Sequence, residues 1–271
     1  MSVLLGVAHG SRDKALQEVV RDLLVLTSRP GLRTEAAYVD NASPSIAGAL
    51  SSLATQGIQD VTVVPILLGA ASHSKTDIAG SVQAARLAHP TMRIRYARPL
   101  GPHPALVTVL ARRLEEVGAA ELPVLLVAGG SLDPDANAGI AATARLLWEG
   151  RAYPFVDFAF VSATGPSVQE ALARLRAQGV TRVALSRYFL GPGYLPTKAL
   201  SLASDVPGIE VIAAEPLGAA PEIAALLLER YDEALHGDIR MNCDGCLYRI
   251  AFPGKEASVG APQQPHTHPD D

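Results

Sequence analysis

The first half of this 271-residue sequence recurs in the second half, and the duplication constrains the fold more than any other feature. Val-Ala-His-Gly-Ser at 7–11 returns 120 positions later as Val-Ala-Gly-Gly-Ser at 127–131. Further matches pair 38–45 with 160–167, 65–69 with 187–191, and the Pro-Leu-Gly of 99–101 with that of 216–218. Because the copies keep the glycines and prolines that set backbone conformation, we expect one scaffold built twice.

The second copy has lost several polar side chains of the first. The replaced residues are His9 (by Gly129), Asp40 (by Ser162), His73 (by Leu195) and His103 (by Ala220). A structural role shared by both copies would be kept by both. The pattern therefore predicts one reactive site, in the first copy. For His103, which precedes Pro104, a helix-start role is the safer interpretation.

Short apolar runs alternate with segments of helical periodicity in both copies. Strands are expected at 3–8, 33–39, 60–68 and 92–97, and again at 124–128, 155–161, 180–190 and 209–214. This alternation predicts an α/β fold of two tandem homologous domains, each a doubly wound parallel sheet. We place the domains at 1–118 and 119–236, followed by a flexible tail at 237–271 that is rich in Gly, Pro, Ser and Gln.

Composition excludes several classes of protein. With 48% hydrophobic and 18% charged residues and a net charge of −4, the chain is typical of a soluble globular protein and has no basic footprint for nucleic acid. No apolar run approaches the ~18 residues of a membrane span and no cationic leader is present, so we expect a cytoplasmic protein without membrane partners. Phosphate-binding and dinucleotide-binding glycine motifs are absent. The sequence does not decide between monomer and homodimer.

Three candidate metal ligands follow three separate strands. His9, Asp40 and His73 each come just after a predicted strand, and in parallel sheets ligands bind beyond the carboxyl ends of the strands. Imidazole suits divalent ions such as those of Fe, Co, Ni and Zn, while a carboxylate adds charge or acts as a base. A lone histidine after a strand is more often a cap or a core residue, but the joint loss of all three from the second copy favours a catalytic role.

These motifs resemble a known family, the sirohydrochlorin chelatases in their long form of two fused homologous domains. The resemblance covers about residues 1–235 and depends on His-Gly-Ser at 9–11, on an acid four residues before Pro44-Ser45, and on the Val-Pro-(apolar)3 strand leading to His73. It implies a class II tetrapyrrole chelatase, a lyase that inserts Fe2+ or Co2+ into sirohydrochlorin without ATP. His9 and His73 match the family's metal-site histidines, and Asp40 matches its acid, which is commonly the longer Glu.

The expected chemistry agrees with this resemblance. A macrocycle that accepts a metal must release its pyrrole protons, and neutral imidazoles can both hold the ion weakly and accept protons near pH 7. Iron insertion towards sirohaem is favoured slightly over cobalt insertion towards cobalamin, although this ligand set accepts either ion. The alternative is a non-catalytic carrier of a metal or tetrapyrrole.

The carboxylates of sirohydrochlorin call for helix N-termini and cations. Candidate substrate-binding residues are Ser11, Arg12, Ser72, Ser74 and Lys75 in the first copy, and Arg187 and Tyr194 in the second, where they are expected to face the first domain across a cleft. Arg12 and Lys75 can equally be solvated surface charges. The two residues of the second copy can equally pack a domain interface.

The tail contains a Met-x-Cys-x-x-Cys motif with Cys243 and Cys246, followed by His266 and His268. Some long-form chelatases have a similar terminal motif that is associated with an iron–sulfur centre. Two thiolates are too few for a four-ligand cluster within one chain. A redox pair, a weak zinc site with the tail histidines and two idle thiols remain as alternatives.

Overall fold

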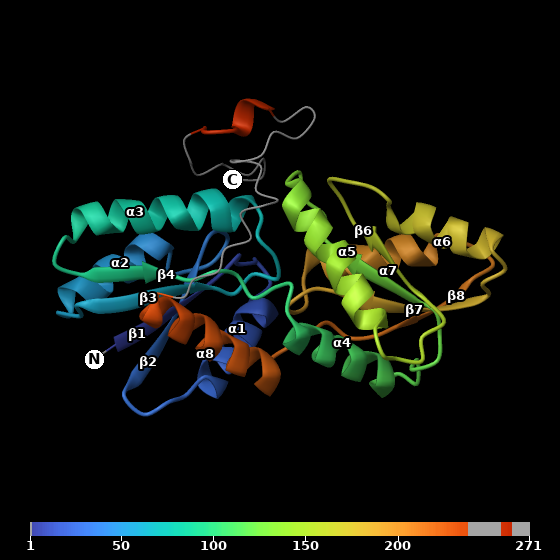
Figure 1. Cartoon of the computed structure of the whole chain (residues 1–271), viewed down its shortest axis with the longest axis horizontal. Helices are drawn as coiled ribbons and strands as arrows, with labels where there is room; N and C mark the ends of the chain where they lie inside the picture. The colour runs from blue at the N-terminus through green and yellow to red at the C-terminus, as the bar shows by residue number, and fades with distance from the viewer. Residues whose placement is uncertain (1, 238–255, 262–271) are drawn as a thin grey trace. The chain divides into compact units, whose positions relative to one another are not determined.

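The structure, a computed structural model, describes residues 2–237 and 256–261 and contains two four-stranded parallel sheets (Figure 1). The first has the order β2-β1-β3-β4 and the second the order β6-β5-β7-β8. The strands are β1 (Ser2–Ala8), β2 (Leu32–Tyr38), β3 (Asp60–Pro65), β4 (Arg93–Tyr96), β5 (Val124–Ala128), β6 (Val156–Phe160), β7 (Arg182–Arg187) and β8 (Glu210–Ala213). The repeated order confirms the predicted α/β fold of two homologous parallel-sheet halves.

Helices connect the strands, and equivalent residues begin the equivalent helices. The helices are α1 (Lys14–Leu26), α2 (Ile46–Thr55), α3 (Ile78–Ala88), α4 (Pro104–Glu116), α5 (Pro134–Trp148), α6 (Val168–Ala177), α7 (Tyr194–Ser204) and α8 (Pro221–His236). Side chains of Asp13 and Asp133 cap α1 and α5, and those of Ser45 and Ser167 cap α2 and α6. His103 caps α4 by accepting the Ala105 N–H at 3.2 Å, which confirms its helix-start role.

The strands predicted at 60–68 and 180–190 extend too far at their carboxyl ends. β3 ends at Pro65 and β7 at Arg187, where strands to Leu68 and Leu190 were expected. The apolar residues that follow β3 leave the sheet to form the loop before His73. Ile66 still donates its N–H to Val7 O at 2.7 Å, and the chain then turns away.

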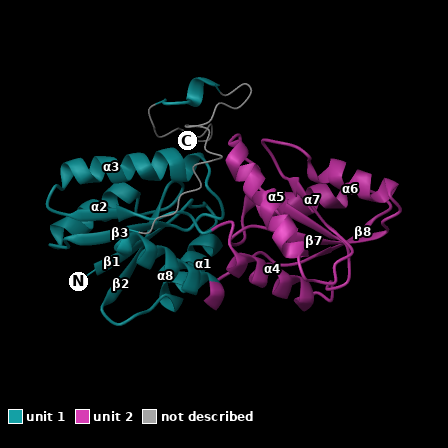
Figure 2. Ribbon diagram, in the orientation of Figure 1, with its two compact units in different colours: residues 1–100, 223–271 teal, residues 101–222 magenta. Residues whose placement is uncertain are grey.

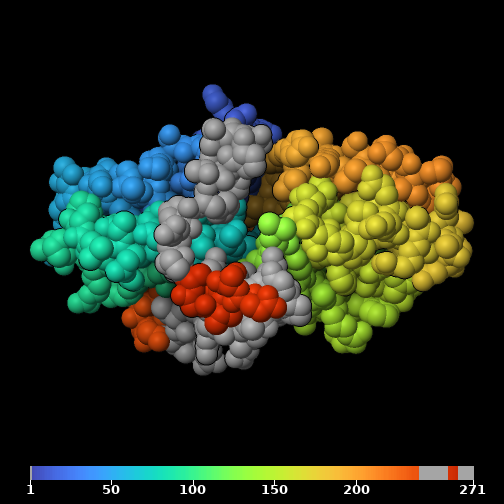
Figure 3. Space-filling model, turned by 90° about the horizontal axis from the view of Figure 1, so that it is seen from above, coloured from blue at the N-terminus to red at the C-terminus, as the bar shows by residue number. Residues whose placement is uncertain are grey.

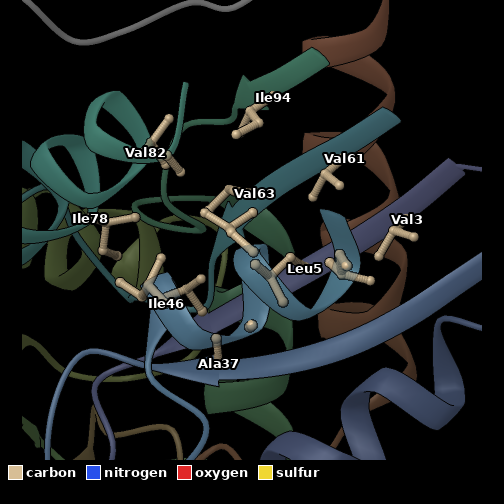
Figure 4. Packing of buried hydrophobic residues seen from close by; sticks show 14 of the residues in the cluster. Val3, Leu5, Ala37, Ile46, Val61, Val63, Ile78, Val82 and Ile94 are labelled. Atoms are coloured by element: carbon tan, nitrogen blue, oxygen red, sulfur yellow. The ribbon is translucent and has the colours of Figure 1, made fainter. Parts of the chain in front are cut away.

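One face of the first sheet packs against α2 and α3 (Figure 4). Alternate strand residues such as Leu5 and Val63 point into this layer, where they meet Ile46 of α2 and Ile78 and Val82 of α3. Side chains of α2 (blue) and α3 (blue-green) then form the outer surface of the first half in the space-filling view of Figure 3.

The compact units of the structure do not follow the sequence repeats. One unit comprises residues 1–100 and 223–271, and the other comprises residues 101–222 (Figure 2). Consequently α4, the last helix of the first repeat, packs on α5 and β7 in unit 2, while α8, the last helix of the second repeat, belongs to unit 1. The domain boundary proposed near residue 119 marks the end of a repeat, whereas the units change at residues 101 and 223.

The helices α4 and α8 each pack in the unit formed mainly by the other repeat, and we call them the exchanged helices. An arginine at an equivalent position attaches each of them to its unit. In unit 1, Arg230 of α8 donates to the carbonyl oxygens of Pro99 and Leu100 at 3.1 and 3.4 Å. In unit 2, Arg113 of α4 donates to Leu217 O at 3.0 Å. Leu100 and Leu217 are equivalent residues of the two Pro-Leu-Gly turns, and the arginines are 117 positions apart, as the turns are. The contacts that attach the two exchanged helices to their units are therefore repeated as well.

Two ion pairs add to the attachment of α8. Arg29, which follows α1, binds Asp232 at 3.0 Å, and Arg98 binds Glu233 at 2.6 Å. Arg230 itself also pairs with Glu229 and Glu233 at 2.8 Å.

No helix among the described residues has the length and apolarity needed to cross a membrane.

Candidate functional site

Two of the three predicted ligands meet at the carboxyl edge of the first sheet. His9 follows β1, and His73 begins a π-helical turn after β3, the strand hydrogen-bonded to β1. Their ring centroids are 4.4 Å apart and the ring planes are nearly perpendicular, at 88°. Two imidazoles that share an ion at about 2.0–2.1 Å each have their nitrogens no more than about 4.2 Å apart. The observed ring separation is compatible with one shared ion.

Both imidazoles have an oxygen partner at Nδ1. His73 Nδ1 lies 2.7 Å from Oδ2 of Asp77, and His9 Nδ1 lies 3.2 Å from Gly10 O. A carboxylate and a carbonyl can only accept hydrogen bonds, so the geometry assigns the proton of each neutral ring to Nδ1. The lone pair then lies on Nε2 in both rings, as a metal ligand requires.

Asp77 is a site residue that the sequence interpretation missed. It ends the π-helical turn His73–Asp77 that leads into α3, and it is 5% exposed. Its counterpart 122 positions later is Ala199, a core residue of unit 2. The comparison of the two copies that singled out His9 and His73 would therefore also have found Asp77.

Tyr96, at the end of β4, completes a polar cluster around the π-helical turn. Its hydroxyl donates to Ser74 O at 2.5 Å. Burial raises the pKa of Tyr96 far above its ordinary value, and the negative charge of Asp77 acts in the same direction. The phenol therefore stays protonated and remains a donor. Its counterpart in the second copy, by strand register, is Ala213.

Asp40 lies beside His9 through its backbone, but its carboxylate is held elsewhere. Asp40 N donates to His9 O at 2.9 Å. Its two carboxylate oxygens accept the backbone N–H and the side-chain amide of Asn41, both at 2.6 Å. Within residues 2–237 and 256–261, no group of three His, Cys, Asp or Glu side chains is arranged to hold a metal ion. The Asp40 carboxylate is thus bound by Asn41, while the rings of His9 and His73 contact each other.

Gly10 makes the close approach of these two loops sterically feasible. Its φ is +96°, and a Cβ atom at this position would lie 1.7 Å from Asp40 O. The same geometry recurs at Gly130, where φ is +86° and a Cβ would lie 2.0 Å from Ser162 O. The loop scaffold is thus common to both units, while the histidines occur in only one of them.

The proposed substrate-binding residues of the first copy occupy different surroundings. Ser11 accepts the Asp13 N–H at 3.0 Å, as Ser131 does from Asp133 in the copy without histidines, which indicates a turn-forming role. Arg12 is exposed and donates to Asn41 Oδ1 at 3.3 Å.

The other three candidates of the first copy lie at the π-helical turn. Ser72 O accepts the hydroxyl of Thr76 at 2.7 Å. Ser74 is buried, and its hydroxyl donates to Ala71 O at 2.9 Å. Lys75 is only 8% exposed, so its side chain is buried and is not a solvated surface charge.

In unit 2 an apolar side chain occupies the corresponding place. A Cβ at Gly129 would lie 3.2 Å from Cδ1 of Leu195, so these counterparts of His9 and His73 are also neighbours. Arg187 is buried, with its guanidinium bound to Ala214 O at 2.7 Å and Glu215 at 3.0 Å. Tyr194 is 74% exposed, and the Lys198 ammonium lies 5.7 Å from its ring centroid.

Cys243 and Cys246 lie outside the described residues.

Comparison with protein families gives a match to CbiX over residues 3–117 and again over 123–234. The two matched segments coincide with the two sequence repeats. The match covers most of the chain and includes every candidate residue except the tail cysteines.

Relatives and solved structures agree with that match. A sirohydrochlorin cobaltochelatase of Priestia megaterium is 31% identical over 93% of this chain and 86% of its own length. A sirohydrochlorin ferrochelatase of Bacillus subtilis is 29% identical over 71% of this chain and 75% of its own length. The structure of SirB from Bacillus subtilis with Fe3+ has a TM-score of 0.75 at 26% identity and covers 89% of this chain and 100% of that one. SirB in complex with cobalt has a TM-score of 0.70 at 27% identity, covering 88% and 99%.

Proposed function

The chain belongs to the CbiX family of class II chelatases, and we propose that it inserts a divalent metal ion into sirohydrochlorin, without ATP, at His9 and His73. The observation that supports this site best is the pair of imidazoles 4.4 Å apart in unit 1, at a position where the otherwise matching unit 2 has glycine and leucine. Both copies keep the fold, but only the first keeps the two histidines. This pattern is typical of a duplicated enzyme with one reaction centre.

A site with two protein ligands suits a metal ion that is transferred to the macrocycle. Because His9 and His73 provide only two nitrogens, the remaining coordination positions stay open to the pyrrole nitrogens of the macrocycle. As the metal enters, the ring releases protons, and a neutral imidazole that leaves the metal can accept one. Binding is thus strong enough to place the ion and weak enough to release it.

Substrate binding in this proposal involves charges near the histidines. Arg12 is exposed on the loop after His9, and Lys75 follows His73 by two positions. Both cations can attract the carboxylates of sirohydrochlorin, Arg12 by direct contact and the buried Lys75 through its field. In unit 2, Tyr194 offers an exposed aromatic ring, whereas Arg187 is already bound within its own unit.

Iron and cobalt are both candidate substrates. The relatives named for cobalt and for iron match this chain at 31% and 29% identity, so their names express no preference. Two imidazoles accept either ion, and metal supply largely decides which one is bound. Supplying Fe2+ and Co2+ in competition, with anaerobic detection of the two products by absorbance, measures the intrinsic preference.

A turnover assay tests the function against the carrier alternative. We expect sirohydrochlorin and Co2+, incubated with a small amount of protein and no ATP, to be converted well beyond one equivalent per chain. Absorbance of the macrocycle follows the conversion, and the uncatalysed rate is subtracted. Conversion that stops at one equivalent would identify a carrier.

Asp40→Ala is expected to slow metal insertion less than loss of either histidine, by under about 10²-fold, the lower end of the range for a lost proton-transfer group. The reason is that the Asp40 carboxylate is bound by Asn41 and is not grouped with the two imidazoles. Initial rates at saturating metal measure the effect. A loss as large as that of the histidine variants would identify Asp40 as a direct ligand or an essential base.

Removing residues 238–271 is expected to leave folding and metal insertion intact. The cut must follow Gly237, since α8 extends to His236 and its Asp232 and Glu233 bind Arg29 and Arg98. Circular dichroism and initial rates compare the shortened chain with the full chain. A folded but inactive shortened chain would assign the chemistry partly to the tail.

Our proposal of an accessory metal or redox role for Cys243 and Cys246 is tested separately. If the pair holds an iron–sulfur centre, full-length protein purified without oxygen will contain iron and absorb visible light, and the Cys243→Ser variant will lose both signals. Colourless, iron-free protein would exclude the iron–sulfur centre while leaving the insertion activity unaffected.

A further inference from the structure

We propose that Asp77 is a positioning residue that fixes the tautomer and orientation of His73, and that Tyr96 holds the turn on which both of them lie. The inference rests on the proposed metal-binding role of His73. Asp77 contacts the proposed metal ligand His73 and is not itself proposed to bind the metal. Three independent observations support it.

The first observation is the contact itself. Asp77 Oδ2 lies 2.7 Å from His73 Nδ1, the distance of a charge-assisted hydrogen bond. The side chains of His73 and Asp77 are 17% and 8% exposed, so water competes little for the bond. An ionised carboxylate cannot donate, and the neutral imidazole is therefore held with its proton on Nδ1 and its lone pair on Nε2.

The second observation is the backbone that brings the two side chains together. His73 and Asp77 are the first and last residues of a π-helical turn. This conformation is rare in proteins overall, and where it occurs it often lies at a functional site. Three polar contacts support this turn: Tyr96 donates to Ser74 O, Thr76 to Ser72 O and Ser74 to Ala71 O. Tyr96 comes from β4, so the sheet itself fixes the turn.

The third observation is that the whole arrangement is absent from unit 2. Leu195, Ala199 and Ala213 replace His73, Asp77 and Tyr96, and α7 starts with a regular α-helical turn. If Asp77 and Tyr96 only stabilised the fold, the same scaffold in unit 2 would need them as well. Their loss together with the histidine indicates that they serve the histidine.

A carboxylate behind a metal-ligating imidazole makes the ring a better ligand. It fixes the ring orientation and raises the electron density available at Nε2, and removing such a partner typically weakens metal affinity or activity by 10–100-fold. His9 Nδ1 lies 3.2 Å from a backbone carbonyl, Gly10 O.

The test uses the full-length protein and the variant Asp77→Asn. Binding of Co2+ alone, followed by its visible absorption, is expected to weaken about 10–100-fold. In metal insertion, kcat is expected to fall while KM for sirohydrochlorin stays within about twofold, because Asp77 is buried behind His73. The matched control is Asp60→Asn, which removes the negative charge paired with Arg95 at the opposite end of β3, and it should bind Co2+ like the wild type.

A second measurement takes its decisive result from the wild-type protein. Nitrogen-15 spectra of histidine-labelled, metal-free protein identify which ring nitrogen of neutral His73 is protonated, with a His73→Gln sample to assign the signal. We expect the Nδ1–H form in the wild type and a mixture of forms in Asp77→Asn. An Nε2–H form in the wild type would overturn the proposal, even if Asp77→Asn failed to fold.

The outcomes separate this inference from the proposed function. Unchanged Co2+ affinity in Asp77→Asn would refute the positioning role while leaving the chelatase activity in place. Conversely, a wild type that binds Co2+ through His73 but never turns over would refute the enzyme proposal and leave the role of Asp77 in metal binding standing.

Discussion

Replacing either His9 or His73 by alanine is expected to lower the rate of metal insertion by at least about 10²–10⁴-fold, the range for loss of a single proton-transfer group. Each change also removes one of two metal ligands, so Co2+ binding should weaken in parallel. The fold should persist, because Gly129 and Leu195 occupy the same positions in unit 2. Absorbance assays measure the insertion rate, and circular dichroism checks the fold.

The matched control for these variants is His89→Ala. His89 belongs to the same unit and contacts Ser51 at 3.3 Å, after α3 and away from the carboxyl ends of the strands. Its loss should leave insertion within about twofold of the wild type. Wild-type turnover in either His9→Ala or His73→Ala would refute the site assignment.

Arg230→Ala is expected to destabilise the protein by about 3–5 kcal/mol, the typical effect of removing one partner from a buried charged network. The Arg230 side chain is 1% exposed. It satisfies two backbone carbonyls and two glutamates, and all of them lose a partner in the variant. Denaturant unfolding, monitored by circular dichroism, measures the change in the free energy of unfolding.

The equivalent change in unit 2 provides the comparison. Arg113 donates to one carbonyl and pairs with Glu116, and its side chain is 24% exposed. Arg113→Ala should therefore cost less than Arg230→Ala. Equal effects, or a loss below about 1 kcal/mol for Arg230→Ala, would mean that burial of Arg230 does not determine the attachment of α8.

The repeat pattern predicted the sheets and the meeting of His9 with His73, because local alternation and shared loops determine both. Asp77 was missed although the same comparison of copies would have revealed it. The surroundings of Arg187 were not predictable in this way. The sequence interpretation made it a substrate-binding residue facing a cleft or a residue of a domain interface, whereas the structure uses it to join the ends of β7 and β8 through Ala214 O.

The exchange of α4 and α8 could not be read from the sequence. Two homologous repeats provide two similar sheets and two similar final helices. The periodicity of α4 predicts an apolar face but does not indicate on which sheet that face packs. The contacts that decide, Arg113 with Leu217 O and Arg230 with Leu100 O, join residues more than 100 positions apart. Such long-range pairing leaves no local signal.

The exchange also makes each half of the chain dependent on the other. A fragment ending at residue 118 would lack α8, and its complement would lack α4, so neither fragment contains a complete unit. Unit 2 is one continuous segment, residues 101–222, whereas unit 1 is completed only by α8 from the far end of the second repeat. A chain of one repeat with this architecture would have to exchange its last helix with a second copy.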